Sequence, residues 1–501
     1  MHTGPPFSAK PTEPPAEALG LAPVLHFLGT ILCCLAGAML VPAAVDLAHG
    51  SPGHRAFVAA AAITLFAGGG LAFAFAGEPG LRMDLRQGVL AVILTWTGTT
   101  LFAALPFLLA DQPLSFTDAV FEAASGLTST GATVWFGGLD GTPRGILLWR
   151  FLLAWMGGFG LVTFAVLVLP HLRVGGLQLF TLDLSARSGK FLPRTAEVVA
   201  WIAVVYVALT LAGAVAFGAA GMGTFDAAGH AMAAVATAGI SSHDAGLGHF
   251  QSPAVEWVAV GLMLLSAMPF VLHVHVLRGQ LGPLLAESQV RLFLAMTATG
   301  VALLAAWRLR SGAGTVEQAL REAAFNIVSA ITTTGFASHD FHQWGAPASL
   351  LVLCAALMGG CTGSTAGGIK MFRLHVLLGA LRAQLQRQVH PSGVFGVRYN
   401  GQPVPPAIVG AVVTYAFAYL ATFALLALAL AFVGLSFEES LGAAAAALAG
   451  VGLGLGPRIG PCCSFAPLPD AAMWLLTLGM LAGRLEILLL ALPLTPAFWR
   501  R

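Results

Sequence analysis

The sequence predicts an all-α membrane protein with ten transmembrane helices and four pseudo-fourfold membrane–pore–membrane repeats. The first observation is composition: 57% of the 501 residues are hydrophobic and only 9% are charged, with a mean hydropathy of +0.84. Soluble proteins carry about 25% charged residues. The second is that four long gaps between apolar spans each hold a segment too short to cross, as re-entrant pore helices do. The third is a glycine turn that ends each of these segments.

The first twenty residues are polar and rich in proline. We expect residues 1–20 to be a disordered cytoplasmic tail rather than a signal peptide, because no basic region leads into a short apolar core. The six cysteines include two adjacent pairs, Cys33-Cys34 and Cys462-Cys463, which match no metal or disulfide spacing. The net charge of +2 gives no sign of a nucleic-acid partner. Membrane lipid is the expected surrounding.

Ten segments have the length of about 20 apolar residues that a membrane helix needs. They lie near residues 22–41, 56–77, 88–110, 146–170, 197–219, 253–277, 288–307, 349–382, 405–434 and 471–494. We divide the chain after the tail into two leading helices and four pore repeats. The boundaries are 21–87 for the leading helices and 88–195, 196–287, 288–400 and 401–501 for the repeats, the third of which includes a gating loop.

Lysine and arginine set the predicted orientation. The tail, the segments 78–87, 171–195, 278–291 and 370–400, and the C-terminal end carry sixteen of them, whereas the alternate connections carry six. Because cytoplasmic loops are enriched in basic residues, this asymmetry places both termini in the cytoplasm. The four re-entrant segments then all open outward.

The four re-entrant segments align on one glycine each. These glycines are Gly131, Gly239, Gly335 and Gly452, spaced 108, 96 and 117 residues apart. A short helix that enters from the outer face brings its partially negative C-terminal end toward the middle of the membrane. Four such ends around one axis favour a cation.

Glycine permits backbone torsions that align consecutive carbonyls, and carbonyl rings can replace the water shell of a monovalent ion. An Asp or Glu ring, which a divalent filter would be expected to carry, is lacking beside the glycines. The alternative is that these are ordinary Gly/Thr helix-packing sites. The predicted ion-binding filter residues are Thr128, Ser129, Thr130, Gly131, Thr237, Ala238, Gly239, Thr332, Thr333, Thr334, Gly335, Gly450, Val451 and Gly452.

The eighth span is interrupted by a run of glycine, serine and threonine that cannot form a regular helix against lipid. Its position directly after the third filter turn predicts a gate, although a glycine kink that only permits close packing is the alternative. The predicted gate residues are Gly359, Gly360, Thr362, Gly363, Ser364, Thr365, Gly367, Gly368, Lys370 and Arg484.

Arg484 belongs to the tenth span, where a charge usually faces the protein interior. It either projects into the pore below the filter, where it would lower cation occupancy, or pairs with Glu486 or another carboxylate. Glu122 and Glu322 are expected to cap or brace their re-entrant helices. His243-Asp244 and His339-Asp340 follow two of the filter glycines and are expected at the outer mouth.

Together these residues resemble the Trk/Ktr/HKT superfamily of potassium transporters, most closely the TrkH type. The segments that carry the resemblance are Thr128–Thr133, Gly239–Asp244, Thr332–Phe336, Gly359–Lys370, Gly483–Ile487 and Thr495–Arg500. The resemblance covers nearly the whole chain. It implies a homodimer with one pore per subunit, a gating loop after the third filter segment, and Arg484 as a pore-facing residue. It also implies a separate cytoplasmic partner, a TrkA-type nucleotide-binding regulatory ring.

Two filter segments depart from the family pattern, which weakens the argument for strict potassium selectivity. The fourth segment, Gly450-Val-Gly-Leu-Gly454, lacks the usual Asn and Pro, and Ala238 precedes the second glycine. The resemblance implies gated potassium uptake, with potassium as substrate and no cofactor. A sodium- or proton-coupled symporter and a weakly selective K/Na transporter remain alternatives. An enzyme is not expected, because paired acids, a nucleophile elbow, a phosphate loop and a metal cluster are lacking.

Overall fold

The computed structural model describes residues 20–76, 83–135, 137–167, 195–312, 314–460 and 464–500. Almost all ordered segments in these ranges are helical, and one two-residue hairpin, β1 (Arg398–Tyr399) with β2 (Gln402–Pro403), is the exception. The expected tail, the basic residues of 171–194 and the Cys462-Cys463 pair lie outside the described residues.

Seven helices in the described ranges are long and apolar enough to cross a membrane, or up to nine if each of two bent pairs is one span. The chain is therefore an integral membrane protein. The long helices are α1 (Ala22–Ala48), α2 (His54–Ala74), α3 (Leu85–Ala103) with α4 (Leu105–Leu109), α6 (Arg144–Leu167), α9 (Thr195–Ala219), α14 (Ser288–Arg310) and α18 (Pro406–Phe432). Each coincides with a span expected from hydropathy.

The sequence did not indicate the two sharp bends. Helix α11 (Pro253–Ser266) meets α12 (Phe270–Leu277) at 101°, and α20 (Asp470–Arg484) meets α21 (Ile487–Ala491) at 110°. Pro269 lies at the first bend, where it lacks the N–H that a continuous helix needs. At the second bend Glu486 has a left-handed φ of 66°.

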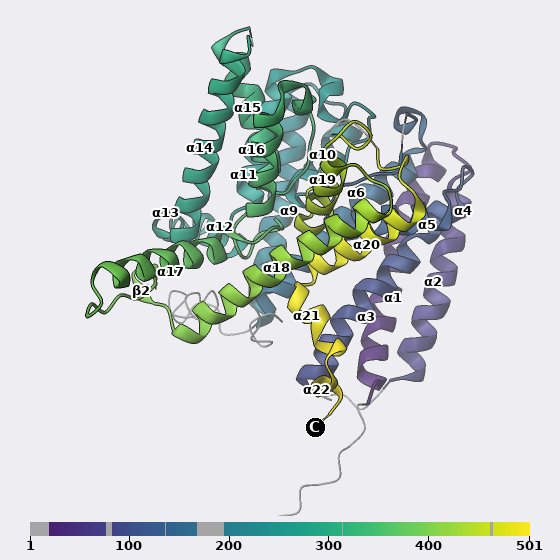
Figure 1. Ribbon diagram of the computed structural model, residues 1–501. Coiled ribbons are helices and arrows are strands. Elements are labelled where there is room, and N and C mark those ends of the chain that lie inside the picture. Colours follow the sequence, from purple (N-terminus) through teal and green to yellow (C-terminus); the bar gives the residue numbers. More distant parts are fainter. Residues whose placement is uncertain are drawn as a thin grey trace, which may run out of the picture.

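The other helices complete the arrangement in Figure 1, where α1–α3 lie at one side and α13–α17 at the other. They are α5 (Phe116–Leu127), α10 (Thr224–Val235), α13 (Gly282–Ala286), α15 (Val316–Ile331), α16 (Ala346–Met358), α17 (Met371–Val389), α19 (Phe437–Ala449) and α22 (Pro496–Trp499). Short 3-10 helices span Leu139–Gly141, Gly246–Phe250, Phe341–Trp344 and Leu492–Leu494.

Close glycine contacts join the leading helices α1 and α2. A Cβ on Gly29 would come within 2.6 Å of the Gly68 carbonyl oxygen, and a Cβ on Gly68 within 2.9 Å of the Gly29 carbonyl oxygen. Small residues of this kind let membrane helices approach closely. At the end of α1, the buried Asp46 accepts a hydrogen bond from the Gly145 backbone N–H at the start of α6. The leading pair is thereby fixed to the rest of the protein.

Four helices, α5, α10, α15 and α19, are only 12 to 16 residues long and mostly buried. Three of them begin with a side-chain cap: Ser115, Thr315 and Ser436 accept backbone hydrogen bonds from their first turns. Each carries an acidic residue in its first turn. A carboxylate there is stabilised by the partially positive N-terminus of the helix. These four short helices coincide with the segments that the sequence predicts to be re-entrant.

Buried glutamates connect these short helices to arginines of neighbouring segments. On α5, the Glu122 carboxylate lies 2.7 Å from Nε of Arg150, which belongs to α6. On α19, the Glu439 carboxylate lies 2.6 Å from Arg458. The bracing role expected for Glu122 therefore corresponds to a buried ion pair.

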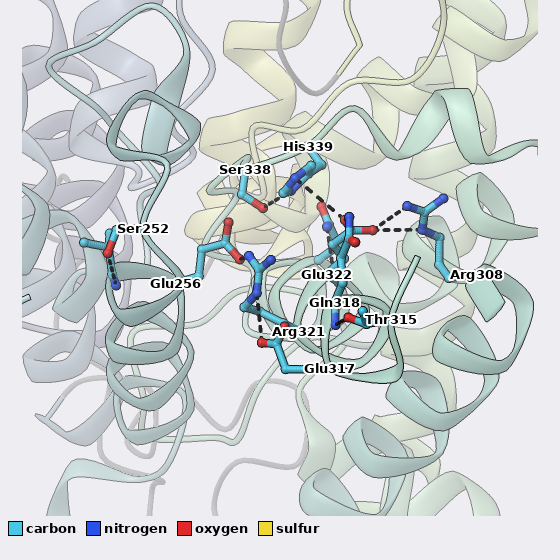
Figure 2. Close-up of polar contacts among 12 residues, drawn as sticks. Ser252, Glu256, Arg308, Thr315, Glu317, Gln318, Arg321, Glu322, Ser338 and His339 are labelled. Carbon is cyan, nitrogen blue, oxygen red and sulfur yellow. Dashed lines mark hydrogen bonds and ion pairs between the residues drawn. The ribbon is translucent and has the colours of Figure 1, made fainter. Parts of the chain in front are cut away.

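Figure 2 shows that α15 is also held by a pair between a buried glutamate and an arginine. Arg308 of α14 donates two hydrogen bonds to the Glu322 carboxylate, at 2.9 and 2.5 Å. The His339 ring lies 3.8 Å from the same carboxylate. The residue directly before Glu322, Arg321, pairs with Glu256 of α11. The third short helix is thus fixed from both sides.

Replacing Arg150 with methionine is expected to destabilise the protein by about 3–5 kcal/mol, because it leaves the Glu122 carboxylate buried and unpaired. The melting temperature of the detergent-solubilised protein measures this loss. The control is Glu317→Ala, which removes a carboxylate that is 63% exposed and pairs with Arg321. An exposed pair contributes roughly 0–1 kcal/mol, so equal losses in both variants would contradict the bracing role.

Candidate functional site

The turns that follow the four short helices share one backbone pattern. Each has two residues with left-handed φ, the aligned glycine and the residue two positions earlier. The pairs are Ser129 (52°) and Gly131 (83°), Thr237 (49°) and Gly239 (61°), Thr333 (53°) and Gly335 (84°), and Gly450 (68°) and Gly452 (71°). A left-handed residue with a Cβ costs roughly 1–2 kcal/mol. Such strain persists only where the surrounding structure imposes it, commonly at functional sites.

The four turns meet in a closed ring. A Cβ added to each glycine would overlap the backbone of the next segment, so the segments are in direct contact in the order first, second, third, fourth and first. The overlapped groups are the Ala238 carbonyl for Gly131, the Thr334 carbonyl for Gly239, the Val451 carbonyl for Gly335, and the Thr130 carbonyl for Gly452. The structure therefore brings together segments that lie about a hundred residues apart in the sequence.

All four glycines line one cavity of ≈ 270 Å³. The Arg150, His243 and Asp244 side chains belong to the same lining. The ring thus has an open mouth on the side where polar and charged residues gather. We call this space the vestibule.

The ring segments differ in their hydroxyl groups. In the first segment the hydroxyls of Thr128 and Thr130 lie 2.8 Å apart, and in the third those of Thr332 and Thr334 are also 2.8 Å apart. In both segments a buried serine of the helix, Ser125 or Ser329, donates a hydrogen bond to the carbonyl that follows the glycine. The second and fourth segments carry alanine or valine where these threonines stand. We call these hydroxyl contacts hydroxyl clamps, and they hold the first and third segments, which lie opposite each other in the ring.

Beneath the ring, helix α16 ends at Met358 and α17 begins at Met371. The connection, Gly359–Lys370, is an irregular loop, as its composition predicted. Three of its glycines and Lys370 have positive φ, between 76° and 83°. Backbone hydrogen bonds anchor its two ends: Cys361 donates to the Ala267 carbonyl, and Met371 donates to the Gly360 carbonyl.

The loop contacts the ring segments directly. The Thr365 hydroxyl donates to the Val235 carbonyl at 3.0 Å, next to the second segment. The Gly367 N–H donates to the Thr333 hydroxyl at 2.6 Å, in the third. A Cβ on Gly367 would overlap the Ala449 carbonyl, next to the fourth. The loop therefore lies against the side of the ring opposite the vestibule.

Arg484 connects the loop to the first segment. Its guanidinium donates to the Thr365 carbonyl and to the Ser129 hydroxyl, both at 2.9 Å. Glu486 pairs instead with Arg373, at 2.7 Å. In the described part of the chain no carboxylate pairs with Arg484, so the ion pair with Glu486 considered from the sequence is not found.

The space between the loop and Arg484 is small. A cavity of ≈ 20 Å³ is lined by Gly363, Gly367, Lys370 and Arg484, among others. A buried water needs at least about 10–15 Å³. This space therefore has room for about one water molecule.

Two residues at the site were not singled out from the sequence. Arg150 lies within an apolar span, a position that by itself indicates function, and it donates to the Ser241 carbonyl and the Thr133 hydroxyl as well as to Glu122. Gln289 is fully buried and its side-chain oxygen accepts a hydrogen bond from the Thr362 N–H of the loop. A polar residue near the start of an otherwise apolar span was the available signal for Gln289.

Comparison with known proteins identifies the family of this chain. The family model described as TrkH, cation transport protein, matches residues 53–499. The chain is 40% identical over 481 residues to the Trk system potassium uptake protein TrkI of Halomonas elongata, covering 96% of this chain and 97% of the relative. It is 35% identical over 484 residues to the Trk system potassium uptake protein TrkH of Escherichia coli, covering 95% and 99%.

A solved structure also matches this chain. The crystal structure of the potassium transporter TrkH from Vibrio parahaemolyticus matches with a TM-score of 0.87 and 34% identity, covering 96% of this chain and 99% of that one. These relatives are transport proteins and not enzymes. The chain belongs to the TrkH family of cation transport proteins.

Proposed function

We propose that this chain takes up potassium across the bacterial cytoplasmic membrane through a filter made of the four ring segments. The observation that carries this proposal is the closed ring of left-handed glycine turns, all lining one vestibule. Peptide carbonyls in such a ring can replace the hydration shell of a monovalent ion. The helix C-termini that lead into the ring add partial negative charge. The names of the relatives supply potassium as the transported ion.

The Gly359–Lys370 loop and Arg484 are proposed as the gate, held closed in this conformation. Contacts of the loop and Arg484 reach the first and third ring segments and the helix ends next to the second and fourth, and the space below holds about one water molecule. Arg484 also places a positive charge beside Ser129. A cation crossing the ring therefore requires the loop to move.

The proposed architecture has ten spans in two leading helices and four pore repeats, with both termini in the cytoplasm. We propose that the protein works as a homodimer with a separate nucleotide-binding regulatory ring, as its family resemblance implies. The "Trk system" in the names of its relatives supports a system of several components.

Passive flux is favoured over sodium- or proton-coupled symport. Coupling usually requires a mid-membrane carboxylate that is free to bind the driving ion. The buried glutamates of the pore helices and gate, Glu122, Glu322, Glu439 and Glu486, each lie within 2.5–2.7 Å of an arginine. These four are therefore engaged in ion pairs.

Rubidium uptake into proteoliposomes tests this function. We expect uptake that follows the rubidium gradient, is competed by potassium more strongly than by sodium, and is unaffected by an imposed sodium or proton gradient. Uptake that requires either gradient would establish coupled symport instead. Equal competition by sodium and potassium would establish a weakly selective transporter.

A further inference from the structure

We propose that Asp140, His243 and His249 form a binding site for a divalent transition metal, with Zn²⁺ as the fitting ion, at the edge of the vestibule. The metal-binding part of this proposal is independent of the transport function. A second part, that the bound ion slows cation entry, rests on the proposed function.

The three side chains converge from two connections. Asp140 lies in the 3-10 helix after the first ring segment, and His243 and His249 lie in the connection after the second. One ligand atom from each residue can be chosen so that all lie within 4.8 Å of one another. The two imidazole rings are stacked, with centroids 3.7 Å apart and planes 5° from parallel. Nδ1 of His243 lies 2.5 Å from the Asp140 carboxylate.

Neighbouring groups hold these residues in place. The Asp244 carboxylate accepts hydrogen bonds from the backbone N–H groups of Gly138 and Leu139, which fixes the turn that carries Asp140. The Phe250 ring contacts both imidazoles edge-on, at 5.3 and 5.2 Å. This support keeps the three residues together, and one imidazole turns out of the parallel stack when an ion binds, because each ligand nitrogen must point at the ion in its ring plane.

One imidazole nitrogen has no hydrogen bond. Nε2 of His243 is buried yet lacks a hydrogen-bond partner in the described structure, and the nearest carboxylate oxygen, of Asp226, lies 3.5 Å away. That Asp226 oxygen already accepts a hydrogen bond from Ser242. An ion shared with Asp140 therefore binds Nδ1 of His243 in place of the hydrogen bond to Asp140, and the ring proton then resides on Nε2, toward Asp226.

The donor set selects the class of metal. Two imidazoles and one carboxylate suit Zn²⁺ and other first-row transition metals, whereas Mg²⁺ and Ca²⁺ prefer oxygen ligands alone. Three protein ligands leave a fourth tetrahedral position for water. Asp140 and His249 are solvent-exposed, which gives an ion a route to the site.

The location gives the site a consequence for transport. His243 lines the same vestibule as the four ring glycines. A bound divalent ion adds positive charge at the entrance and lowers the local concentration of monovalent cations by repulsion. Zn²⁺ on the outer side is therefore expected to inhibit uptake.

Binding is tested with Co²⁺, a spectroscopic substitute for Zn²⁺, on purified full-length protein whose affinity tag has been removed and whose cysteines have been alkylated. We expect one Co²⁺ per chain with visible absorption bands of a tetrahedral or five-coordinate site, displaced by Zn²⁺. Loss of one ligand in His249→Ala or Asp140→Asn should weaken binding by roughly 100-fold, since even supporting residues contribute 10–100-fold. The matched control is His342→Ala, because His342 is a partly exposed histidine with a single carboxylate, of Glu438, within 4.0 Å.

Transport is tested by external Zn²⁺ during rubidium uptake into proteoliposomes, with each variant compared with its own uptake in EDTA. Inhibition should be lost in His249→Ala, retained in His342→Ala and restored in His249→Cys, whose thiolate is also a zinc ligand. The metal site is overturned if Co²⁺ shows no stoichiometric binding, or binds His249→Ala and Asp140→Asn as it binds the unmodified sequence. Stoichiometric binding without inhibition would overturn only the effect on entry, and a protein with no uptake at all would bear on the proposed function and not on the site.

Discussion

Gly335→Ala is expected to lower rubidium uptake at least about tenfold and to remove most of the discrimination against sodium. Gly335 has a φ of 84°, and any Cβ there would overlap the Val451 carbonyl. The left-handed torsion alone costs a residue with a Cβ roughly 1–2 kcal/mol, and about 1.4 kcal/mol is a tenfold change in an equilibrium. Displacing the Val451 carbonyl changes the ring itself, so ion preference should change together with rate.

Gly434→Ala is the control for Gly335→Ala. Gly434 also has a left-handed φ, 100°, but no atom lies within 4 Å of its added Cβ. This variant should carry the torsional cost without the effect on uptake. Sodium and rubidium uptake are measured for Gly335→Ala and Gly434→Ala at matched amounts of protein. An unchanged sodium-to-rubidium ratio in Gly335→Ala would count against the ring as the filter.

Replacing Arg484 with methionine is expected to raise rubidium uptake by about tenfold or more. The guanidinium makes two hydrogen bonds, to the Thr365 carbonyl and the Ser129 hydroxyl. Hydrogen bonds of charged groups contribute about 1.5–3 kcal/mol each, so losing both should shift the loop toward open conformations. Removing the positive charge also lets cations occupy the space below the ring.

Arg484→Lys separates the contribution of the positive charge from that of the two hydrogen bonds in the proposed gate. Lysine keeps the charge but cannot reproduce the forked geometry of the guanidinium, so its uptake should lie between those of the unmodified sequence and Arg484→Met. Initial rates in proteoliposomes with equal incorporated protein provide the measurement. A rate in Arg484→Met at or below that of the unmodified sequence would show that this contact does not hold the path closed.

Much of the site was predictable because its chemistry is local. Each glycine turn is specified by a short stretch of sequence. The left-handed torsions found at Gly131, Gly239, Gly335 and Gly452 favour glycine because it has no Cβ. The interruption of the eighth span was also predictable, because glycine-rich sequence cannot remain helical against lipid. Closed contact around the ring followed only from the structure.

Tertiary contacts were much harder to predict. Nothing in the spacing of Arg484 and Glu486 indicated that Glu486 pairs with Arg373, 113 positions away. The bend at Glu486 depends on a left-handed residue that sequence propensity disfavours. Similarly, the link between Gln289 and the loop spans 73 positions. Such contacts depend on how separate helices are placed, and local pattern carries no information on that placement.

The alternation of hydroxyl clamps around the ring affects how the ion preference of the proposed filter can evolve. In a channel of four identical chains, one codon change alters every quarter of the filter at once. Here Thr128 and Thr332 belong to clamped quarters, whereas Ala236 and Ala449 occupy the corresponding positions of the other two. A single mutation therefore adjusts one quarter alone, and selection can alter the balance between potassium and sodium in small energetic steps.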